Sequence, residues 1–235
     1  MISKEFFRNI HESKSKYKEY SIHKGKVPLQ FIEQLKTKQD VDLNYLCHFL
    51  DKIPSHLFHD LKSVRIENLP EFEKRSINAL YRDSTIYVSN FQDNTYDMLD
   101  DIVHELAHSV EVNYENLIYG DGHLRDEFLD KRKKILFYIE AYEIGFPKGI
   151  NKKSFLNINF DINFDNYLYK HLGYPRLDQH IKGIFPSSYS VTSLREYFAV
   201  GFTDFYIHGG GKFKNTCPVL YSKISKVANL REKNK

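Results

Sequence analysis

Cysteine is scarce in this 235-residue chain and tryptophan is absent. Cys47 and Cys217 form no CxxC arrangement, which excludes a disulfide framework and a zinc site built from cysteines. No apolar run approaches the roughly 18 residues of a membrane-spanning helix, and the first ten residues lack the apolar stretch of a secretory signal peptide. We therefore expect no membrane span, and a protein that is either cytoplasmic or delivered by a non-classical route.

An excess of charge of one sign is also missing, because 34 basic residues oppose 31 acidic ones. With 41% hydrophobic residues, the composition is that of a folded domain and excludes collagen, a disordered chain and a coiled coil. Seven basic residues lie within residues 1–26 and seven within 212–235. We predict a basic N-terminal extension over 1–26, one domain over 27–211 and a basic C-terminal tail over 212–235, with both ends solvated. The tyrosines are not interleaved with basic residues, so nucleic acid is not the expected partner.

Hydrophobic periodicity divides the chain into a strand-bearing first part and a helical second part. We expect an interrupted amphipathic helix over 28–50, strands over 63–69 and 84–89, and helices over 97–114, 123–144 and 193–206. Gly209 ends the last of these helices, and the pattern over 149–188 gives no assignment. The order predicts an α+β domain with a small twisted N-terminal sheet, ending in the Ser84–Ser89 strand, and a mainly helical C-terminal half.

The segment His104-Glu105-Leu106-Ala107-His108 is an HExxH motif within the helix expected over 97–114. Residues four apart lie about 40° apart around a helix, so both imidazoles can approach one metal ion. The spacing is typical of zinc, with Glu105 beside the two ligands as a general base. Leu99, Ile102, Leu106 and Val110 lie on the opposite side, which predicts that the helix buries one face and presents metal-binding chemistry on the other.

Two glutamates can supply the third ligand that a catalytic zinc requires. Glu127 follows His108 by 19 residues, a spacing found in aminopeptidase-like zinc enzymes, although a solvated helix face also explains it. Glu196 lies on the helix over 193–206, where it can instead form a capping box with Ser193. A zinc-binding interaction protein without catalysis is a further alternative, and the presence of Glu105 argues against it.

Three side chains near these motifs have two interpretations each. Glu111 and Asp101 can hold a liganding histidine through a hydrogen bond, or be ordinary exposed acids. His208 can support a developing oxyanion, or stabilise the end of its helix.

The motif His104–His108, followed by Tyr189-x6-Glu196-Tyr-Phe-Ala, resembles the lethal-factor-like zinc metallopeptidases, the gluzincin group that includes the Pro-Pro endopeptidases. The resemblance implies a zincin-like fold and a zinc-dependent endopeptidase with one Zn²⁺ per chain. It implies that Glu196 is the third ligand and that Tyr189 faces the reacting carbonyl.

The same resemblance implies a protein or peptide substrate that lies extended along the edge strand of the sheet. Toxins of this family act outside the producing cell. His108 and Glu196 are 88 residues apart, which predicts an insertion over 115–188.

Overall fold

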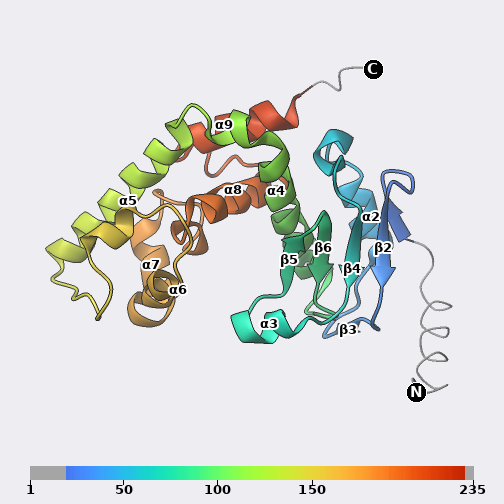
Figure 1. The fold of residues 1–235 in the computed structure, drawn as a ribbon, viewed down its shortest axis with the longest axis horizontal. Helices are drawn as coiled ribbons and strands as arrows, with labels where there is room; N and C mark the ends of the chain where they lie inside the picture. Colours follow the sequence, from blue (N-terminus) through green and yellow to red (C-terminus); the bar gives the residue numbers. More distant parts are fainter. Residues whose placement is uncertain (1–19, 231–235) are drawn as a thin grey trace. The chain divides into compact units, whose positions relative to one another are not determined.

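The computed structural model describes residues 20–230, with only the backbone for His180 and Ile181. The chain divides into two compact units, residues 1–113 and 114–235. The first contains the sheet and the second is helical (Figure 1), which confirms an α+β chain with a small N-terminal sheet and a helical C-terminal half. The predicted extension up to residue 19 and the predicted tail after residue 230 lie outside the described residues. For residues 20–26 the predicted solvated extension is wrong, because Tyr20–Ile22 forms a strand of the sheet and Ile22 is 0% exposed.

Unit 1 is built on a five-stranded sheet of order β1-β2-β4-β6-β5. The inner strands β2, β4 and β6 are parallel, while β1 and β5 pair antiparallel with their neighbours. A second pair, β3 with β7, is short and parallel. The strands are β1 (Tyr20–Ile22), β2 (Val27–Phe31), β3 (Lys36–Thr37), β4 (Ser63–Ile66), β5 (Ala79–Arg82), β6 (Thr85–Val88) and β7 (Phe91–Gln92).

The sheet buries rows of paired aliphatic side chains. Leu29 pairs with Val64, and Val64 pairs with Ile86, so one row crosses three strands. Ile66 and Val88 form the next row, and each of these five side chains is at most 5% exposed. The predicted strands over 63–69 and 84–89 are confirmed as β4 and β6 in shortened form.

The helix predicted from Pro28 onward is wrong in its first half, because Val27–Phe31 forms the strand β2. The apolar spacing of Leu29 and Ile32 is helical, but Leu29 is buried through pairing with β4 and Ile32 is 45% exposed. Tertiary pairing therefore overrides the local pattern. Helix α2 (Leu43–Leu50) covers the second half of the prediction and packs against β1.

In chain order β6 is the last strand of the five-stranded sheet, as predicted for Ser84–Ser89. It does not lie at the edge, however, because β5 lies outside it. The two strands form a hairpin whose two-residue turn, Asp83-Ser84, has positive φ at both positions. Such a turn is normally marked by glycine or asparagine, so its sequence gives little sign of the hairpin. The sheet therefore has β1 at one edge and β5, Ala79–Arg82, at the other, next to β6.

Helix α4 (Thr95–Tyr119) confirms the helix predicted over 97–114 and extends beyond it. Asn94 precedes its first turn, and its side chain accepts hydrogen bonds from the backbone N–H groups of Tyr96 and Asp97. Tyr114 has non-helical backbone angles and marks a kink. The shorter helical segments of unit 1 are η1 (Ser55–Phe58) and α3 (Pro70–Arg75).

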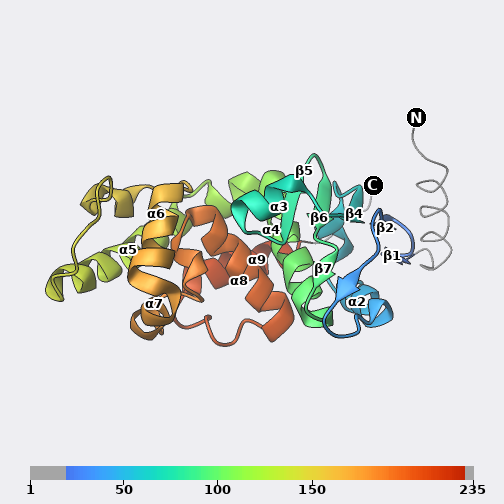
Figure 2. The same ribbon diagram turned by 90° about the horizontal axis from the view of Figure 1, so that it is seen from below.

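Unit 2 consists of helices (Figure 2). They pack around a core of aromatic side chains. Phe128, Phe185 and Tyr197 contact one another there, with ring centroids 5.3–5.9 Å apart. The segment over 149–188 that the sequence left unassigned consists of short helices. The elements are α5 (His123–Ala141), η2 (Lys152–Leu156), α6 (Ile162–Asn166), η3 (Tyr167–Gly173), α7 (Tyr174–Ile181), η4 (Tyr189–Val191), α8 (Leu194–His208) and α9 (Pro218–Ala228).

Helix α9 lies within the segment predicted to be a solvated tail, and that expectation is wrong for residues 218–228. Leu220, Ile224 and Val227 are fully buried, and α9 packs against α5 and α8. The packing against α8 is close, because a Cβ atom at Gly201 would lie 2.5 Å from Leu220 Cδ2. The contact of Gly201 with Leu220 thus holds α8, the helix that carries Glu196, close to α9.

Candidate metal centre

Helix α4 carries the HExxH motif and places the two histidine side chains on the same side of the helix. His104 and His108 are both partly buried, with ring centroids 5.2 Å apart. Leu99, Ile102, Leu106 and Val110, predicted to form the buried side, are 0% exposed. The hydrophobic burial of the helix therefore determines where the imidazoles point, as the sequence predicted.

Glu105 lies between the two histidines and is held by the edge strand. Its Oε2 accepts a hydrogen bond of 2.6 Å from the backbone N–H of Tyr81 in β5, and the residue is 9% exposed. This contact fixes one carboxylate oxygen and leaves the other as a proton acceptor. This contact could not be predicted from the sequence, because β5 itself was not predicted.

Glu111 is the residue that orients His108. Its Oε2 lies 2.6 Å from His108 Nδ1, and Glu111 is 4% exposed. A histidine whose Nδ1 is bonded to a carboxylate in this way has its Nε2 available as a ligand atom. Of the two interpretations of Glu111, the structure supports the one in which it holds a histidine.

Asp101 has a different environment, one turn before His104. Its Oδ2 accepts a hydrogen bond from Gln92 Nε2 at 3.3 Å. Burial raises the pKa of this carboxyl to about 7, with a further contribution from the charge of Asp97.

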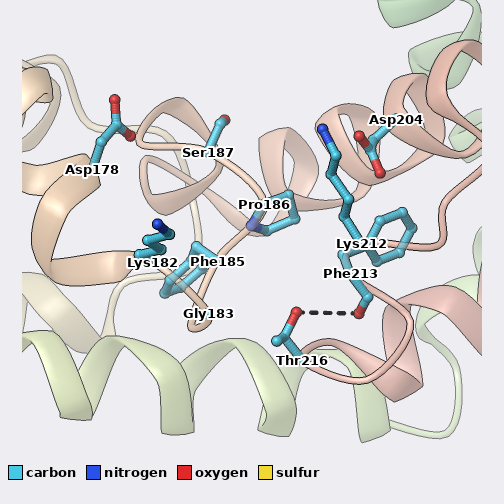
Figure 3. Close-up of a pocket in the computed structure, with 10 residues that line it drawn as sticks. All are labelled: Asp178, Lys182, Gly183, Phe185, Pro186, Ser187, Asp204, Lys212, Phe213 and Thr216. Carbon is cyan, nitrogen blue, oxygen red and sulfur yellow. Dashed lines mark hydrogen bonds between the residues drawn. The ribbon is translucent and has the colours of Figure 1, made fainter.

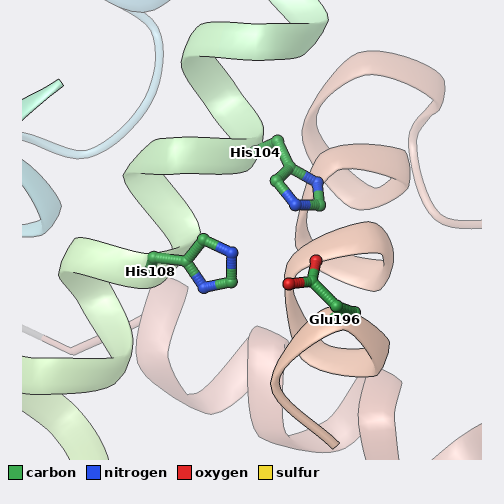
Figure 4. Close-up of side chains that lie close together, drawn as sticks. All are labelled: His104, His108 and Glu196. Atoms are coloured by element: carbon green, nitrogen blue, oxygen red, sulfur yellow. The ribbon is translucent and has the colours of Figure 1, made fainter. Parts of the chain in front are cut away.

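Glu196 lies in the first turn of α8, whose start is fixed by Ser193. The Ser193 Oγ accepts a hydrogen bond of 3.1 Å from the Glu196 N–H, so the helix start predicted from the capping pattern is confirmed. Glu196, His104 and His108 each offer one ligand atom, and these atoms all lie within 4.8 Å of one another (Figure 4). A set of two imidazoles and a carboxylate could hold a metal ion.

Glu127, the other candidate for third ligand, has a structural role within unit 2. Its two carboxylate oxygens accept hydrogen bonds from the backbone N–H groups of Val219 and Leu220 and from the hydroxyl of Tyr197, at 2.9–3.0 Å. A carboxylate at this position satisfies N–H groups that the first turn of α9 leaves without helical partners. In the part of the chain that the structure describes, the metal-competent group contains Glu196 and not Glu127.

Tyr189 begins the turn η4 just before α8 and is partly exposed. The hydroxyl of a second tyrosine, Tyr174, donates a hydrogen bond of 3.0 Å to Asp165. Burial, together with the negative charge of Asp165, raises the pKa of Tyr174. Tyr174 and Asp165 were missed because the unassigned segment over 149–188 carries no motif that marks them.

Unit 2 also contains a cavity of about 650 Å³, between the end of α7 and the loop after α8. Phe185 and Phe213 supply apolar wall, while Asp204 and Lys212 supply charge (Figure 3). None of the five residues predicted to form the metal and catalytic site lines it, so it is separate from the candidate metal centre. His208, the alternative oxyanion donor, is exposed in the last turn of α8.

No protein-family model, curated protein or solved structure matches this chain. No helix within residues 20–230 is long and apolar enough to cross a membrane.

Proposed function

We propose that this chain is a zinc-dependent endopeptidase, with His104, His108 and Glu196 as the metal ligands. The clustering of these three ligand atoms within 4.8 Å is the observation that carries the proposal. Ligand atoms about 2.1 Å from a tetrahedral zinc lie about 3.4 Å apart, so the three side chains need only small adjustments to bind one ion. Two histidines and a glutamate leave the fourth position open, as catalysis requires.

Bound zinc supplies Lewis acidity, which polarises the scissile carbonyl and lowers the pKa of a water molecule. Glu105 is the general base: it accepts a proton from the attacking water and passes it to the leaving amine. Its hydrogen bond to the Tyr81 N–H holds the carboxylate in one orientation during both transfers. Glu111 holds His108 in the tautomer that leaves Nε2 for the metal.

Tyr189 donates a hydrogen bond to the oxyanion that forms on the scissile carbonyl, a role that the resemblance to lethal-factor-like metallopeptidases suggests. The zincin-like identity of the domain is part of the same proposal. The protein or peptide substrate lies extended along β5, the edge strand, and adds to the sheet through backbone hydrogen bonds. Glu105, the proposed general base, accepts a hydrogen bond from the Tyr81 N–H of that strand. The base is therefore directly linked to the strand along which the substrate lies.

Metal analysis combined with peptide-library cleavage tests this function. We expect about one zinc per chain and endoproteolysis that a chelator abolishes and added zinc restores. Glu105→Gln should keep the zinc and the fold, because its amide oxygen still accepts the Tyr81 N–H, but it should lose activity since an amide takes no proton. Zinc binding without cleavage would identify a zinc-binding interaction protein, and near-normal turnover of Glu105→Gln would remove Glu105 as the base.

A further inference from the structure

The turn η4 carries Tyr189 and leads within four residues to Ser193, the residue that begins α8. A tyrosine hydroxyl stabilises an oxyanion only when the backbone beneath it is fixed, because a displacement of about 1 Å can cost two orders of magnitude in rate. The contacts that fix this turn come from two other helices of unit 2. One set acts at its beginning and the other at its end.

Asp178 of α7 holds the beginning of the turn. Its Oδ1 accepts hydrogen bonds from the backbone N–H of Ser188, at 3.1 Å, and from the Ser188 hydroxyl. Ser188 immediately precedes Tyr189 and is 4% exposed. The aspartate side chain thus restrains the Ser187–Ser188 peptide group and the Ser188 side chain, immediately before Tyr189.

Arg132 of α5 holds the end of the turn. Its guanidinium donates to the backbone carbonyl oxygen of Val191 from both Nε (2.8 Å) and Nη2 (2.6 Å), and to that of Thr192 from Nη2 (2.7 Å). Nη1 donates to the carbonyl oxygen of Asn157. One planar group therefore joins the turn to a separate loop of the same unit.

The burial of Arg132 is costly and needs a reason. The residue is 0% exposed and, among the described residues, it forms no ion pair with a carboxylate. The rings of Phe128 and Phe164 lie 4.5 and 4.6 Å from its Cζ and provide only partial compensation. Burial lowers its pKa to about 9, so it remains charged at neutral pH. An apolar side chain would fill the space at lower cost but could not bind three carbonyl groups in a fixed arrangement.

We propose that Arg132 and Asp178 are positioning residues that hold the backbone of the turn at both ends and so place the Tyr189 hydroxyl for catalysis. The inference rests on the proposed function, since it concerns the residue assigned to the oxyanion. Neither side chain touches the substrate, and each acts through Tyr189.

Lys131 provides a matched control. It is adjacent to Arg132 on α5, it is 6% exposed, and its Nζ donates to two backbone carbonyl oxygens, those of Ile184 (2.7 Å) and Thr216 (2.5 Å). It is therefore another buried cation bound to carbonyl groups, but it does not contact the turn. Loss of a buried cation in general should affect Lys131 and Arg132 variants equally, whereas loss of positioning should affect Arg132 variants alone.

The test is a set of double-mutant cycles, with kcat and KM measured on one cleavable peptide. Arg132→Lys and Asp178→Ala, which removes the oxygen that accepts both Ser188 hydrogen bonds, should each lower kcat roughly tenfold and change KM by less than about threefold. In the Tyr189→Phe background each should cost less than about twofold, because the hydroxyl they position is gone. Lys131→Met should have the same effect in both backgrounds. Equal losses from Arg132→Lys and Asp178→Ala with and without the Tyr189 hydroxyl would overturn the proposal.

Hydrogen exchange on the full chain gives a readout that does not depend on activity. The N–H groups of Val191 and Thr192, bonded to the carbonyl oxygens of Ser188 and Tyr189, should exchange roughly tenfold faster in both variants, while α9 amides stay unchanged. Unchanged exchange at the turn would overturn the positioning role even in a parent protein that cleaves no peptide. Asp178 is exposed, so its variant keeps the test valid if Arg132→Lys does not fold.

Discussion

The Tyr189 hydroxyl is the group in the proposed mechanism whose contribution is easiest to isolate. Tyr189→Phe removes one oxygen and keeps the ring, so fold and zinc content should stay unchanged. We expect kcat to fall by roughly 10²–10³, the usual loss for one oxyanion donor, with a much smaller change in KM. Steady-state kinetics checks this, with His208→Ala as the control at the exposed end of α8. If His208→Ala is the more damaging change, the donor is His208.

Asp101 links the stability of the metal-free protein to pH. Its folded-state pKa of about 7 lies well above the unfolded value of about 3.9, so the folded state binds more protons between these limits. The burial of this carboxyl therefore does not lower the free energy of unfolding below about pH 4. It lowers that free energy increasingly as the pH rises to about 7. The full difference between the folded and unfolded pKa corresponds to at most roughly 4 kcal/mol of unfolding free energy.

Asp101→Asn removes that cost and leaves an oxygen for the Gln92 amide. We expect the metal-free variant to be more stable than the parent by a few kcal/mol at pH 8, and the gain to disappear as the pH falls toward 4. Urea unfolding of both proteins at several pH values measures it, and groups common to both cancel in the difference. A difference that does not change with pH would contradict a raised pKa at Asp101.

Helix α9 depends on Glu127, whereas metal binding should depend on Glu196. Glu127→Gln replaces one carboxylate oxygen by an NH₂ group facing hydrogen-bond donors, and should lower the free energy of unfolding by about 1–3 kcal/mol without loss of zinc. Glu196→Gln should weaken zinc binding on the order of 100-fold, with little effect on the metal-free protein. Thermal unfolding and zinc titration of both variants test the distinction. A loss of zinc in Glu127→Gln alone would make Glu127 the ligand.

Zinc should stabilise the folded chain as a whole, since its proposed ligands come from residues as far apart as His104 and Glu196. A ligand present at about 1,000 times its Kd stabilises the state that binds it by ~4 kcal/mol, which for a chain of this length raises Tm by roughly 10 °C. Calorimetry with and without a chelator measures the shift. Glu105→Gln should show the same shift as the parent, and His108→Ala should show almost none.

Local signals were sufficient for the helices that carry the candidate site. The asparagine before α4, the serine before α8 and Gly209 after it act on their own backbone neighbours, and the buried side of α4 follows from a periodicity of 3.6 residues. For the same reason the pairing of His104 with His108 could be predicted, because two residues one turn apart on a helix are neighbours in any fold.

Contacts between distant segments were not available to sequence reasoning. Strand β2 is a strand because β4 lies beside it, and β5 is the edge because an unremarkable Asp83-Ser84 turn folds it onto β6. The choice between Glu127 and Glu196 likewise depended on tertiary contacts. Glu127 is bonded to α9, more than 90 residues away, whereas Glu196 places a ligand atom within 4.8 Å of those of His104 and His108.

Short sequence motifs therefore predict the residue types of the candidate site. Tertiary contacts decide which of these residues come together and which neighbours hold them in place. HExxH specifies ligand types and their spacing through the geometry of one helix, and no packing is needed to read it. Three features of the site join segments between 24 and 92 residues apart. They are the proposed third ligand Glu196, the hydrogen bond from Tyr81 to Glu105, and the hydrogen bonds of Arg132 to the turn that carries Tyr189. Such contacts form only when folding brings the segments together, because burial and backbone pairing, rather than local propensity, determine which polar groups meet.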